Sequence, residues 1–370
     1  MKVAFILNSL SIGGSERKIV NIANRMSDNG WDVSILYISG SNELQPDIYK
    51  SITVLKLTHS RESFFNAIKR SFKYITENNI DSVFTVNMYP LLFALGPKIK
   101  LQSKLRMISL TNTTHFECIK KKVQMLIYRL ALSFSDHIVF GANCQKKIWK
   151  NRYLLHHIPS SVIYNGVDTY KFSLSKEISE KSDILRKDLS LESYDCTFCT
   201  VAQLRVEKRH IDIIDACAHL KQKGINVACM FVGGSSNEYQ QELLERAKKY
   251  GVVNNIKFIG QVDDCRPYLA ASNCFLLASE SETFSNAALE AMSLSLPVLM
   301  TNVGGASEMV IENNNGFLFN ALDPQSMANK MELIISGQQD HLGYNARKRV
   351  TDSFSYQSMI KSYMDIAHHD

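Results

Sequence analysis

The sequence predicts an α/β protein that contains two doubly wound domains. Short apolar runs, typical of buried parallel strands, alternate with amphipathic helical stretches along the chain. The alternation forms two series, and the polar segment 168–193 separates them. The chain has 370 residues, 45% of them hydrophobic, which is enough to build two domains with sizeable cores.

The predicted strands of the two series follow one another in regular order. They cover residues 2–7, 33–38, 52–57, 82–86, 106–110, 137–140 and 161–163, then 197–202, 227–232, 256–259, 273–277, 297–300 and 317–319. Amphipathic helical stretches lie between them, for example at 18–27 and 238–250. Ligands of doubly wound sheets bind beyond the carboxyl ends of the strands. The loops that follow these strands are therefore where we expect functional residues.

Several classes of protein are excluded at this stage. The apolar run at 2–7 is too short for a signal peptide and is better explained as a first buried strand. No run approaches the roughly 18 apolar residues that a membrane span needs. Cys196 and Cys199 form a C-x-x-C pair inside a strand-like run, and no second pair completes a zinc site. We expect buried thiols in a cytoplasmic protein.

Charge is distributed unevenly along the chain. The net charge is +6, but residues 1–170 carry +11 and the remainder carries −5. A basic half suggests that this half faces an anionic partner. Nucleic acid, anionic lipid and a pyrophosphate-linked acceptor are the candidates.

Two carboxylates, Glu282 and Glu290, are separated by seven residues and follow a predicted strand. We expect a helix over 285–293 that Ser285 caps, and a helix N-terminus after a strand is a ready anion site. A carboxylate further along the helix is suited to accept hydrogen bonds from hydroxyl groups. The combination indicates a sugar nucleotide, although a surface helix with two ordinary acids has the same spacing.

The neighbouring segments make the assignment more specific. The helix continues into Ala291-Met-Ser-Leu-Ser-Leu-Pro-Val298, and Gly304-Gly-Ala-Ser-Glu308 follows. In these segments the chain resembles the retaining glycosyltransferases of family 4, which carry E-x7-E, E-A-M-A-x-G-x-P-V and G-G-x-x-E. Further segments match that family in order, so the resemblance covers most of the chain.

The resemblance implies the GT-B fold, in which two Rossmann-like domains face a central cleft. It implies an N-terminal acceptor-binding domain at 1–166, and a C-terminal nucleotide-sugar-binding domain at 167–353. The last helix, at about 354–370, is expected to cross back to the first domain. The turn at Asn165-Gly166, typical of the junction between domains in this family, is more simply explained as structural.

The resemblance also implies roles on the donor side. Glu290 would hold the ribose hydroxyls, and Glu282 would contact the transferred sugar near its anomeric carbon. The main chain of the intervening segment would face the diphosphate; its residues are Thr283, Phe284, Ser285 and Asn286.

A cationic segment follows the strand predicted at 197–202. Lys208 matches the lysine of the family pattern G-R-L-x-x-x-K, but Gln203 occupies the usual arginine position and Arg205 comes two residues later. Because side chains alternate along a strand, we expect Arg205 to point the same way as the missing arginine. Positive charge here would stabilise the departing diphosphate. Salt-bridged surface residues are the simpler alternative.

Two glycine-containing loops of the second series resemble the nucleotide-binding loops of the family. Gly233 lies in a V-G-x-G-like loop, and Val262 ends an F-x-G-x-V segment that lies near the nucleobase in relatives. Both segments could also be ordinary strand ends.

Two segments of the first series are candidates for the acceptor side. Gly13 and Gly14 permit close backbone approach at a strand–helix turn and resemble the family's G-G-x-E-R segment, which lies near the donor diphosphate as well as the acceptor, so they are also donor-binding candidates. His115 follows the strand predicted at 106–110, where a family histidine lies near the reacting sugar. An ordinary tight turn and a structural histidine are the alternatives.

Basic segments of the first half suggest where an anionic partner binds. They are 64–74, the helical stretch 118–130 with apolar residues at 119, 123, 126, 127 and 130, and 146–152. Solvated basic faces explain them equally well. The functional alternative is docking on anionic lipid headgroups, whereas no nucleic-acid-binding motif is present.

The sequence therefore predicts a retaining, hexosyltransferase-type glycosyltransferase. It would move a sugar from a nucleotide diphosphate donor, with UDP the expected nucleotide, to an acceptor hydroxyl. The expected acceptor is a lipid-pyrophosphate-linked saccharide of bacterial lipopolysaccharide or capsule assembly, at the inner face of the cytoplasmic membrane. No D-x-D motif occurs, so we expect no metal and no cofactor. A nucleotide-sugar epimerase of the same fold and a non-catalytic nucleotide-sugar-binding subunit remain alternatives.

Overall fold

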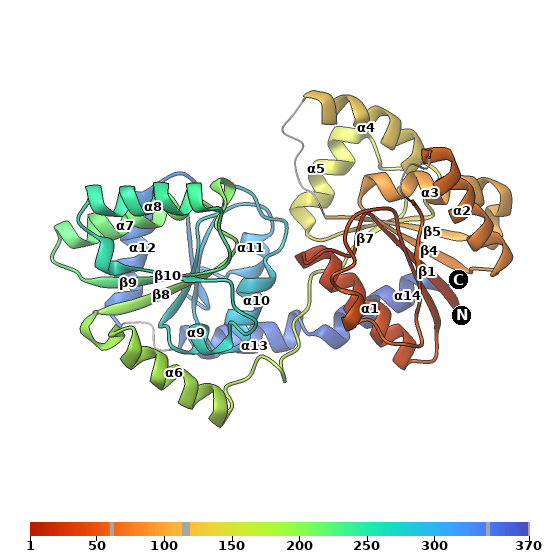
Figure 1. Ribbon diagram of the computed structural model, residues 1–370. Helices are drawn as coiled ribbons and strands as arrows, with labels where there is room; N and C mark the ends of the chain where they lie inside the picture. Colours follow the sequence, from red (N-terminus) through yellow and green to blue (C-terminus); the bar gives the residue numbers. More distant parts are fainter. Residues whose placement is uncertain (60–62, 113–118, 338–340, 369–370) are drawn as a thin grey trace. The chain divides into compact units, whose positions relative to one another are not determined.

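The computed structural model describes residues 1–59, 63–112, 119–337 and 341–368. The chain divides into two compact units. Unit 1 comprises Met1–Tyr164 and Gln357–Asp370, and unit 2 comprises Asn165–Tyr356. These boundaries lie within three residues of those expected from the sequence. Each unit contains one parallel sheet with helices on both faces (Figure 1).

The sheet of unit 1 has the strand order β3-β2-β1-β4-β5-β6-β7. Because the order reverses direction between β1 and β4, the topological switch point lies there. The strands are β1 (Lys2–Leu7), β2 (Asp32–Tyr37), β3 (Thr53–Lys56), β4 (Ser82–Val86), β5 (Arg106–Thr111), β6 (His137–Phe140) and β7 (Ser160–Val162).

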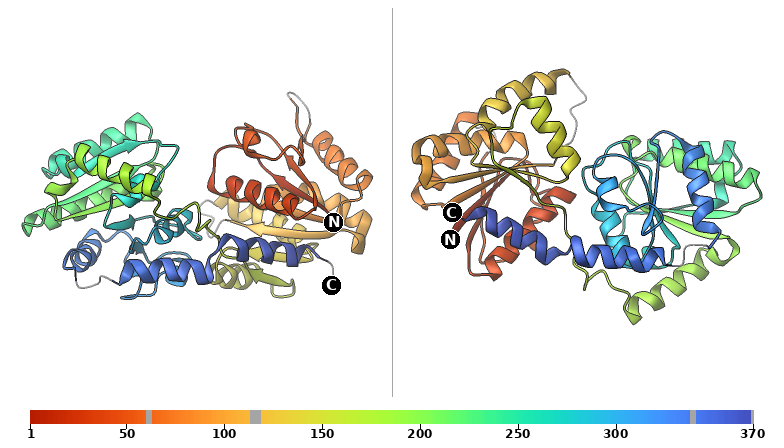
Figure 2. Two further views of the ribbon diagram at one scale, coloured as in Figure 1. Left: turned by 90° about the horizontal axis from the view of Figure 1, so that it is seen from below. Right: turned by 180° about the vertical axis from the view of Figure 1, so that it is seen from behind.

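The helices of unit 1 cover both faces of this sheet. One face carries α2 (Phe64–Glu77), α3 (Met88–Leu101), α4 (Ile119–Leu132) and α5 (Asn143–Tyr153). The opposite face carries α1 (Gly14–Asp28) and α14 (Tyr356–Ala367), as Figures 1 and 2 show. A core that includes Ile6, Phe93, Phe140 and Trp149 fills the space beneath the first group of helices.

The last helix returns to unit 1, as the sequence predicts. The Ser82 hydroxyl donates a hydrogen bond to the Ala367 carbonyl oxygen at 2.7 Å. The buried ring of Tyr363 packs edge-on against Phe84, with 6.1 Å between their centroids. These contacts join α14 to β4 of the first sheet.

The sheet of unit 2 has the order β10-β9-β8-β11-β12-β13. Its strands are β8 (Cys196–Val201), β9 (Val227–Val232), β10 (Ile256–Gly260), β11 (Cys274–Leu277), β12 (Val298–Thr301) and β13 (Gly316–Phe319). Its helices are α6 (Lys176–Asp188), α7 (His210–Gln222), α8 (Asn237–Lys249), α9 (Arg266–Ala270), α10 (Asn286–Ser293), α11 (Ala306–Met309), α12 (Pro324–Ile335) and α13 (Leu342–Ser353).

Packing in unit 2 follows from this connectivity. Helix α7 packs against α8 and α12, while α10 packs against α13 and α6 packs against α9. Every predicted strand of both series is present, and the observed bounds differ by one residue at most. The central strands form because their apolar runs are buried on both faces of a parallel sheet, whereas the edge strands β3 and β7 are only partly buried.

Helix α4 buries less apolar surface than its sequence offers. Met125, Ala131 and Leu132 are buried, but Ile127 and Leu130 are 62% and 70% exposed. Part of the apolar stripe expected on this helix therefore faces solvent. Among the described residues no helix is long and apolar enough to cross a membrane.

Candidate functional site

The predicted donor segment lies at the start of α10, and its local structure follows from its sequence. Ser285 caps the helix, because its hydroxyl accepts a hydrogen bond from the Ala288 N–H at 3.3 Å. Its backbone is extended, with φ −74° and ψ 117°, as an N-cap requires. Asn286 is the first residue of the helix, so the N–H groups of its first turn lie next to the loop that joins β11 to α10.

Glu282 lies in that loop and meets Lys208 from another loop. The Lys208 Nζ atom donates to the Glu282 Oε1 atom at 2.5 Å, and the Ser279 hydroxyl donates to the same oxygen at 3.1 Å. The two side chains are 25% and 16% exposed. They meet because β8 and β11 are neighbours in the sheet, which brings the loops after these strands to one edge.

The cationic loop is tied to the same edge by its main chain. The Glu280 N–H donates to the Glu207 carbonyl oxygen at 3.0 Å, which places the end of the short helix η4 (Val206–Lys208) beside the loop after β11. The next residue, Arg209, pairs with Asp212 through two hydrogen bonds of 2.7 and 3.0 Å. Together these bonds fix the stem from which Lys208 extends.

Arg205 and Gln203 lie outside the regular strand. Strand β8 ends at Val201, but Leu204, which lies between these two residues, is buried and forms an isolated bridge with Ser235. Gln203 and Arg205 are exposed, and the Arg205 guanidinium lies 3.9 Å from Glu207. The exposed side chains of Gln203 and Arg205 thus flank a buried one, in keeping with the expected alternation, and the role of Arg205 stays a prediction. Lys208 is the cation that contacts Glu282.

Glu290 is partly buried on α10, about one turn from the N-terminus of the helix. The Cys265 thiol donates to the Glu290 Oε2 atom at 3.8 Å. Burial, followed by the nearby Glu290 carboxylate, raises the pKa of Cys265 to about 12. The thiol is therefore a neutral hydrogen-bond donor to this carboxylate at physiological pH.

The glycine loop after β12 contacts the Glu282 segment directly. The Gly305 N–H donates to the Thr283 carbonyl oxygen at 2.9 Å. On the other side, the Asn165 amide donates to the Phe284 carbonyl oxygen at 2.8 Å. Two hydrogen bonds therefore hold the main chain between Glu282 and the start of α10.

Close packing of the backbone requires glycine at position 233. Gly233 has φ +155°, and a Cβ atom there would lie 2.0 Å from the Ala202 carbonyl oxygen. Its N–H donates to the Gly260 carbonyl oxygen at 2.8 Å. The glycine thus joins the loop after β8 to the end of β10. Val262 follows two residues later and is partly buried.

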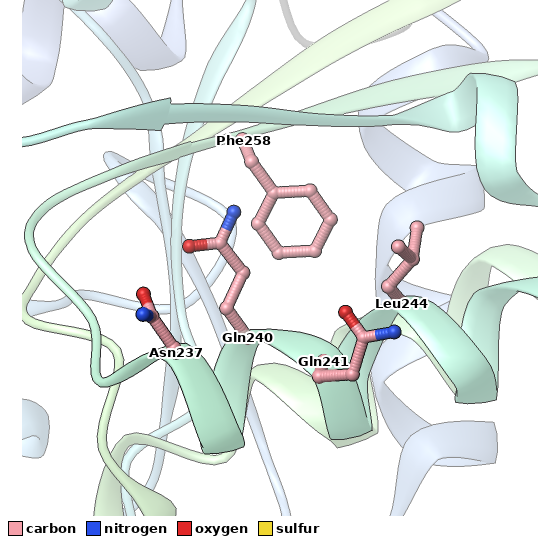
Figure 3. Close-up of a pocket in the computed structure, with 5 residues that line it drawn as sticks. All are labelled: Asn237, Gln240, Gln241, Leu244 and Phe258. Carbon is pink, nitrogen blue, oxygen red and sulfur yellow. The ribbon is translucent and has the colours of Figure 1, made fainter.

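A shallow pocket of about 240 Å³ opens beside these loops, on helix α8. Figure 3 shows the Phe258 ring pointing toward side chains of the helix. The lining residues are Asn237, Gln240, Gln241, Leu244 and Phe258. These residues are all outside the predicted donor set, so the pocket does not define the donor site.

The predicted acceptor residues belong to unit 1. Gly13 precedes α1 in extended conformation, with φ −152°, and Gly14 is the first residue of that helix. A Cβ atom at Gly13 would lie 2.4 Å from the Glu16 Oε2 atom, so the glycine leaves room for that carboxylate. His115 lies outside the described residues.

The sequence did not identify two polar contacts of this site. Ser279 and Cys265 lie against the two predicted carboxylates, but neither belongs to the motifs quoted above. Cys196 and Cys199 are buried in β8, as expected for structural thiols. Within the described ranges, no group of histidine, cysteine or carboxylate residues is arranged to hold a metal ion.

Comparison with known proteins gives two family matches. Residues 12–171 match the model "Glycosyltransferase Family 4", and residues 181–349 match "Glycosyl transferases group 1". An uncharacterized glycosyltransferase of Haemophilus influenzae is 24% identical over 367 residues, 98% of each chain. A Campylobacter jejuni N-acetyl-D-galactosaminyltransferase, whose acceptor is a diphosphoundecaprenol-linked saccharide, is 23% identical over 95% of this chain and 94% of its own.

Solved structures show the same fold. Anabaena HepE in complex with UDP has a TM-score of 0.85 at 19% identity, with 99% of each chain covered. WaaG, a glycosyltransferase of lipopolysaccharide biosynthesis, has a TM-score of 0.74 at 18% identity over both complete chains. The two parallel sheets with flanking helices are therefore those of the GT-B fold. The chain is a glycosyltransferase and belongs to glycosyltransferase family 4.

Proposed function

We propose that this enzyme transfers a sugar from a UDP-sugar to a hydroxyl of a lipid-linked saccharide, with retention of anomeric configuration. The observation that carries the proposal is the contact between Lys208 and Glu282 beside the N-terminus of α10. A cation, a carboxylate and a set of helix N–H groups are thereby gathered at the carboxyl edge of one sheet.

Each group has a distinct task on the donor. The first-turn N–H groups of α10 and the Lys208 ammonium bind the diphosphate, with Arg205 adding positive charge from the exposed part of the same loop. Glu290 accepts hydrogen bonds from the ribose hydroxyls, and the Cys265 thiol helps to orient it. Glu282 contacts the sugar near the carbon that reacts.

In this proposal Lys208 has two alternative partners, Glu282 and the donor diphosphate. Competition between them contributes to catalysis. Without donor, its ammonium neutralises Glu282. A bound diphosphate offers stronger negative charge, so Lys208 moves toward the phosphate and leaves the carboxylate for the sugar hydroxyls. The developing charge on the leaving diphosphate is then stabilised without a metal ion.

The acceptor side rests on unit 1. His115 and the Gly13-Gly14 turn are proposed to contact the acceptor. Support for a lipid-linked acceptor comes from relatives named for diphosphoundecaprenol-linked substrates in Campylobacter jejuni and Escherichia coli. Two Staphylococcus aureus relatives are named for capsular polysaccharide biosynthesis. We place this enzyme in the same kind of assembly.

The exposed side chains of unit 1 support the proposal that this unit associates with a membrane. Phe65 is 72% exposed at the start of α2, with Lys69 and Lys73 on the same side of the helix at i+4 and i+8. Ile127 and Leu130 are exposed on α4. Apolar anchors among cations are suited to anionic headgroups. We propose that unit 1 docks on the inner face of the cytoplasmic membrane.

A donor screen tests the proposed reaction. Purified enzyme is incubated with a panel of nucleotide sugars and lipid-linked acceptors, nucleoside diphosphate release is measured, and the product is identified by mass spectrometry and its anomeric configuration by NMR. We expect acceptor-dependent release from a UDP-sugar. Donor turnover without acceptor would favour the epimerase, and binding without any turnover would favour the non-catalytic subunit.

A matched pair of lysine variants tests the role of the contact between Lys208 and Glu282. Lys208 and Lys223 flank the two ends of α7, roughly 20 Å apart, and each forms an ion pair, Lys223 with Glu332. We expect Lys208→Ala to lower kcat by about 10²-fold, the usual cost of removing one charge-stabilising donor. Lys223→Ala keeps wild-type kcat. Equal kcat values for the two variants would exclude the proposed role of Lys208.

A further inference from the structure

A small pocket of unit 2 has no role in the proposed reaction. It has a volume of about 240 Å³ and lies between helix α8 and strand β10 (Figure 3). Strand β10 stands at one end of the strand order, and β9 separates it from β8. Because β8 is the strand that leads to Lys208, the pocket lies to one side of the proposed donor site, by about two strand spacings or roughly 10 Å.

One face of α8 presents three side-chain amides to this pocket. Asn237, Gln240 and Gln241 occupy positions i, i+3 and i+4 of the helix, which places them on the same side. All three residues are exposed, and their amide groups make no hydrogen bond with the described part of the chain. Each amide carries two N–H donors and a carbonyl acceptor. The pocket therefore offers several donors and acceptors to a ligand.

Phe258 supplies an aromatic surface opposite these amides. Its partly buried ring extends from β10 toward the helix (Figure 3). The buried ring of Phe231 supports it from the core side through an edge-on contact, with 5.6 Å between centroids. Leu244 completes the apolar part of the lining. An aromatic ring and hydrogen-bonding amides thus meet in one small space.

Size and charge limit what this pocket can bind. None of its five described lining residues is charged, so a phosphate, a nucleotide diphosphate or a lipid headgroup is poorly matched to it. Its volume corresponds to roughly eight water molecules at about 30 Å³ each. Pockets for larger organic ligands begin at about 300 Å³. The matching ligand is therefore small and neutral, with hydrogen-bonding groups at its edge and an apolar face.

A sugar ring combines these properties. Its hydroxyl groups exchange hydrogen bonds with planar amides, whereas its C–H face packs on an aromatic ring. We propose that the pocket is a second saccharide-binding site, which holds one neutral sugar ring of a glycan apart from the sugar of the donor. This inference goes beyond the proposed function and uses none of its donor contacts. Only the benefit to the enzyme, which is to keep a growing glycan on unit 2, rests on the proposed function.

Saturation-transfer difference NMR tests the proposal with the full-length protein. The probes are the methyl glycosides of glucose, galactose, N-acetylglucosamine and N-acetylgalactosamine. Each is titrated in the presence of saturating UDP, which occupies the nucleotide part of the donor site. We expect at least one glycoside to bind. The double substitution Gln240→Ala/Gln241→Ala should weaken its affinity by about 10-fold, because each neutral hydrogen bond that is lost accounts for about 2- to 10-fold.

Gln325→Ala is the matched control. Gln325 is an exposed residue of α12 in the same unit, and its amide donates to Asn329 at 3.0 Å. This variant should bind the glycoside as the wild type does, and UDP affinity, measured by calorimetry, should be the same in all three proteins. Equal glycoside affinities in the three proteins, or no binding of any probe, would overturn the proposal. A loss of UDP affinity in the double variant would assign the pocket to the nucleotide and overturn it too.

Selective irradiation of aromatic protons gives a second readout. Protons on one face of the bound sugar should receive the strongest saturation, and Phe258→Leu should remove this pattern. The Tm of that variant is measured first, because Phe258 packs on Phe231; if it does not fold, the amide variants decide the outcome. Uniform saturation of the sugar protons would overturn the stacking and with it the assignment of the pocket. Since binding is measured without turnover, failure of the donor screen would reject the proposed reaction and leave this site standing.

Discussion

Gly304 lies directly against the main-chain carbonyl of Glu282. A Cβ atom at Gly304 would be 1.6 Å from the Glu282 carbonyl oxygen, and the glycine has φ +55°. The loop after β12 therefore supports the loop that carries the proposed sugar-binding carboxylate. The first glycine of the G-G-x-x-E segment is therefore required by packing, independently of any contact with substrate.

We expect Gly304→Ala to displace the Glu282 loop and to lower kcat by at least 10²-fold. Gly224→Ala is the matched control, because Gly224 has φ +77° with nothing within 4 Å of the added Cβ. Both variants bear the left-handed backbone cost of about 1–2 kcal/mol. The difference in kcat and Tm between them therefore reports the steric clash of the added Cβ atom with the Glu282 carbonyl oxygen. Similar kcat and similar Tm for the two proteins would show that the contact is unimportant.

Substitution of each of the two carboxylates of the donor segment should have a different effect on the enzyme. Glu290→Ala should weaken UDP binding by about 10- to 100-fold, because a hydrogen bond to a charged group contributes about 1.5–3 kcal/mol. Glu282→Ala should leave UDP binding nearly unchanged and lower the single-turnover rate. Calorimetry with UDP and rapid-quench kinetics separate the effects, and Glu332→Ala serves as a remote control. Unchanged UDP affinity in Glu290→Ala would contradict the assignment.

Activity should not depend on a divalent metal. The proposed diphosphate site uses Lys208 and the N-terminus of α10 as its positive charge. We therefore expect the same kcat/KM after dialysis against EDTA as in a saturating concentration of Mg²⁺ or Mn²⁺. Loss of activity in EDTA that Mn²⁺ restores would refute this expectation.

Membrane docking can be tested with two leucines of similar exposure. Leu130 on α4 is 70% exposed in unit 1, and Leu174 is 63% exposed in unit 2. We expect Leu130→Glu to reduce binding to anionic vesicles by more than 10-fold at low salt, since insertion of a leucine contributes about 1.5–3 kcal/mol. Leu174→Glu should bind as wild type does. Co-sedimentation measures both, and equal binding would exclude α4 as an anchor.

The sequence predicts the strands and the start of α10 because, at these places, the local sequence pattern and the requirements of tertiary packing favour the same structure. Apolar runs such as 82–86 and 227–232 become strands, since both faces of a parallel sheet are buried. Ser285 identifies the start of α10 for a purely local reason. The relation between loops is harder to predict. The Lys208–Glu282 contact spans two loops whose proximity depends on the order of β8 and β11.

The differences also have physical causes. Arg205 lies beyond the end of β8 at Val201 and directly before η4, so its position relative to the diphosphate stays a prediction. On α4, Met125 and Leu132 face the core, whereas Ile127 and Leu130 lie on another face of the helix and are exposed. Cys265 meets Glu290 only through folding, and no local pattern records that contact.

A buried histidine next to Lys208 should make stability depend on pH. His210 is fully buried, and both of its ring nitrogens lack a hydrogen-bond partner in the part of the chain that the structure describes. Its ring packs edge-on against Phe231, with 4.9 Å between centroids. Burial, followed by the charge of Lys208, lowers the pKa of His210 from 6.5 to about 3. The folded protein therefore holds this imidazole in its neutral form.

The direction of the effect follows from proton linkage. Above pH 6.5 the histidine is neutral in both states and contributes no pH dependence. Below pH 6.5 the unfolded chain binds a proton that the folded protein refuses, so the free energy of unfolding falls by about 1.4 kcal/mol per pH unit until about pH 3. At pH 5 the accumulated loss is about 2 kcal/mol.

We expect His210→Leu to remove this component of acid sensitivity. The free energy of unfolding is measured in urea at pH 7.5, 6.0 and 5.0. Between pH 7.5 and pH 5.0, that of the wild type should fall by about 2 kcal/mol more than that of the variant. His137, whose pKa is lowered to about 4 mainly by burial, adds its own slope to both proteins and cancels in the comparison. Parallel stability curves for the two proteins would mean that His210 takes up a proton in the folded state, and that its surroundings are more hydrated than its burial indicates.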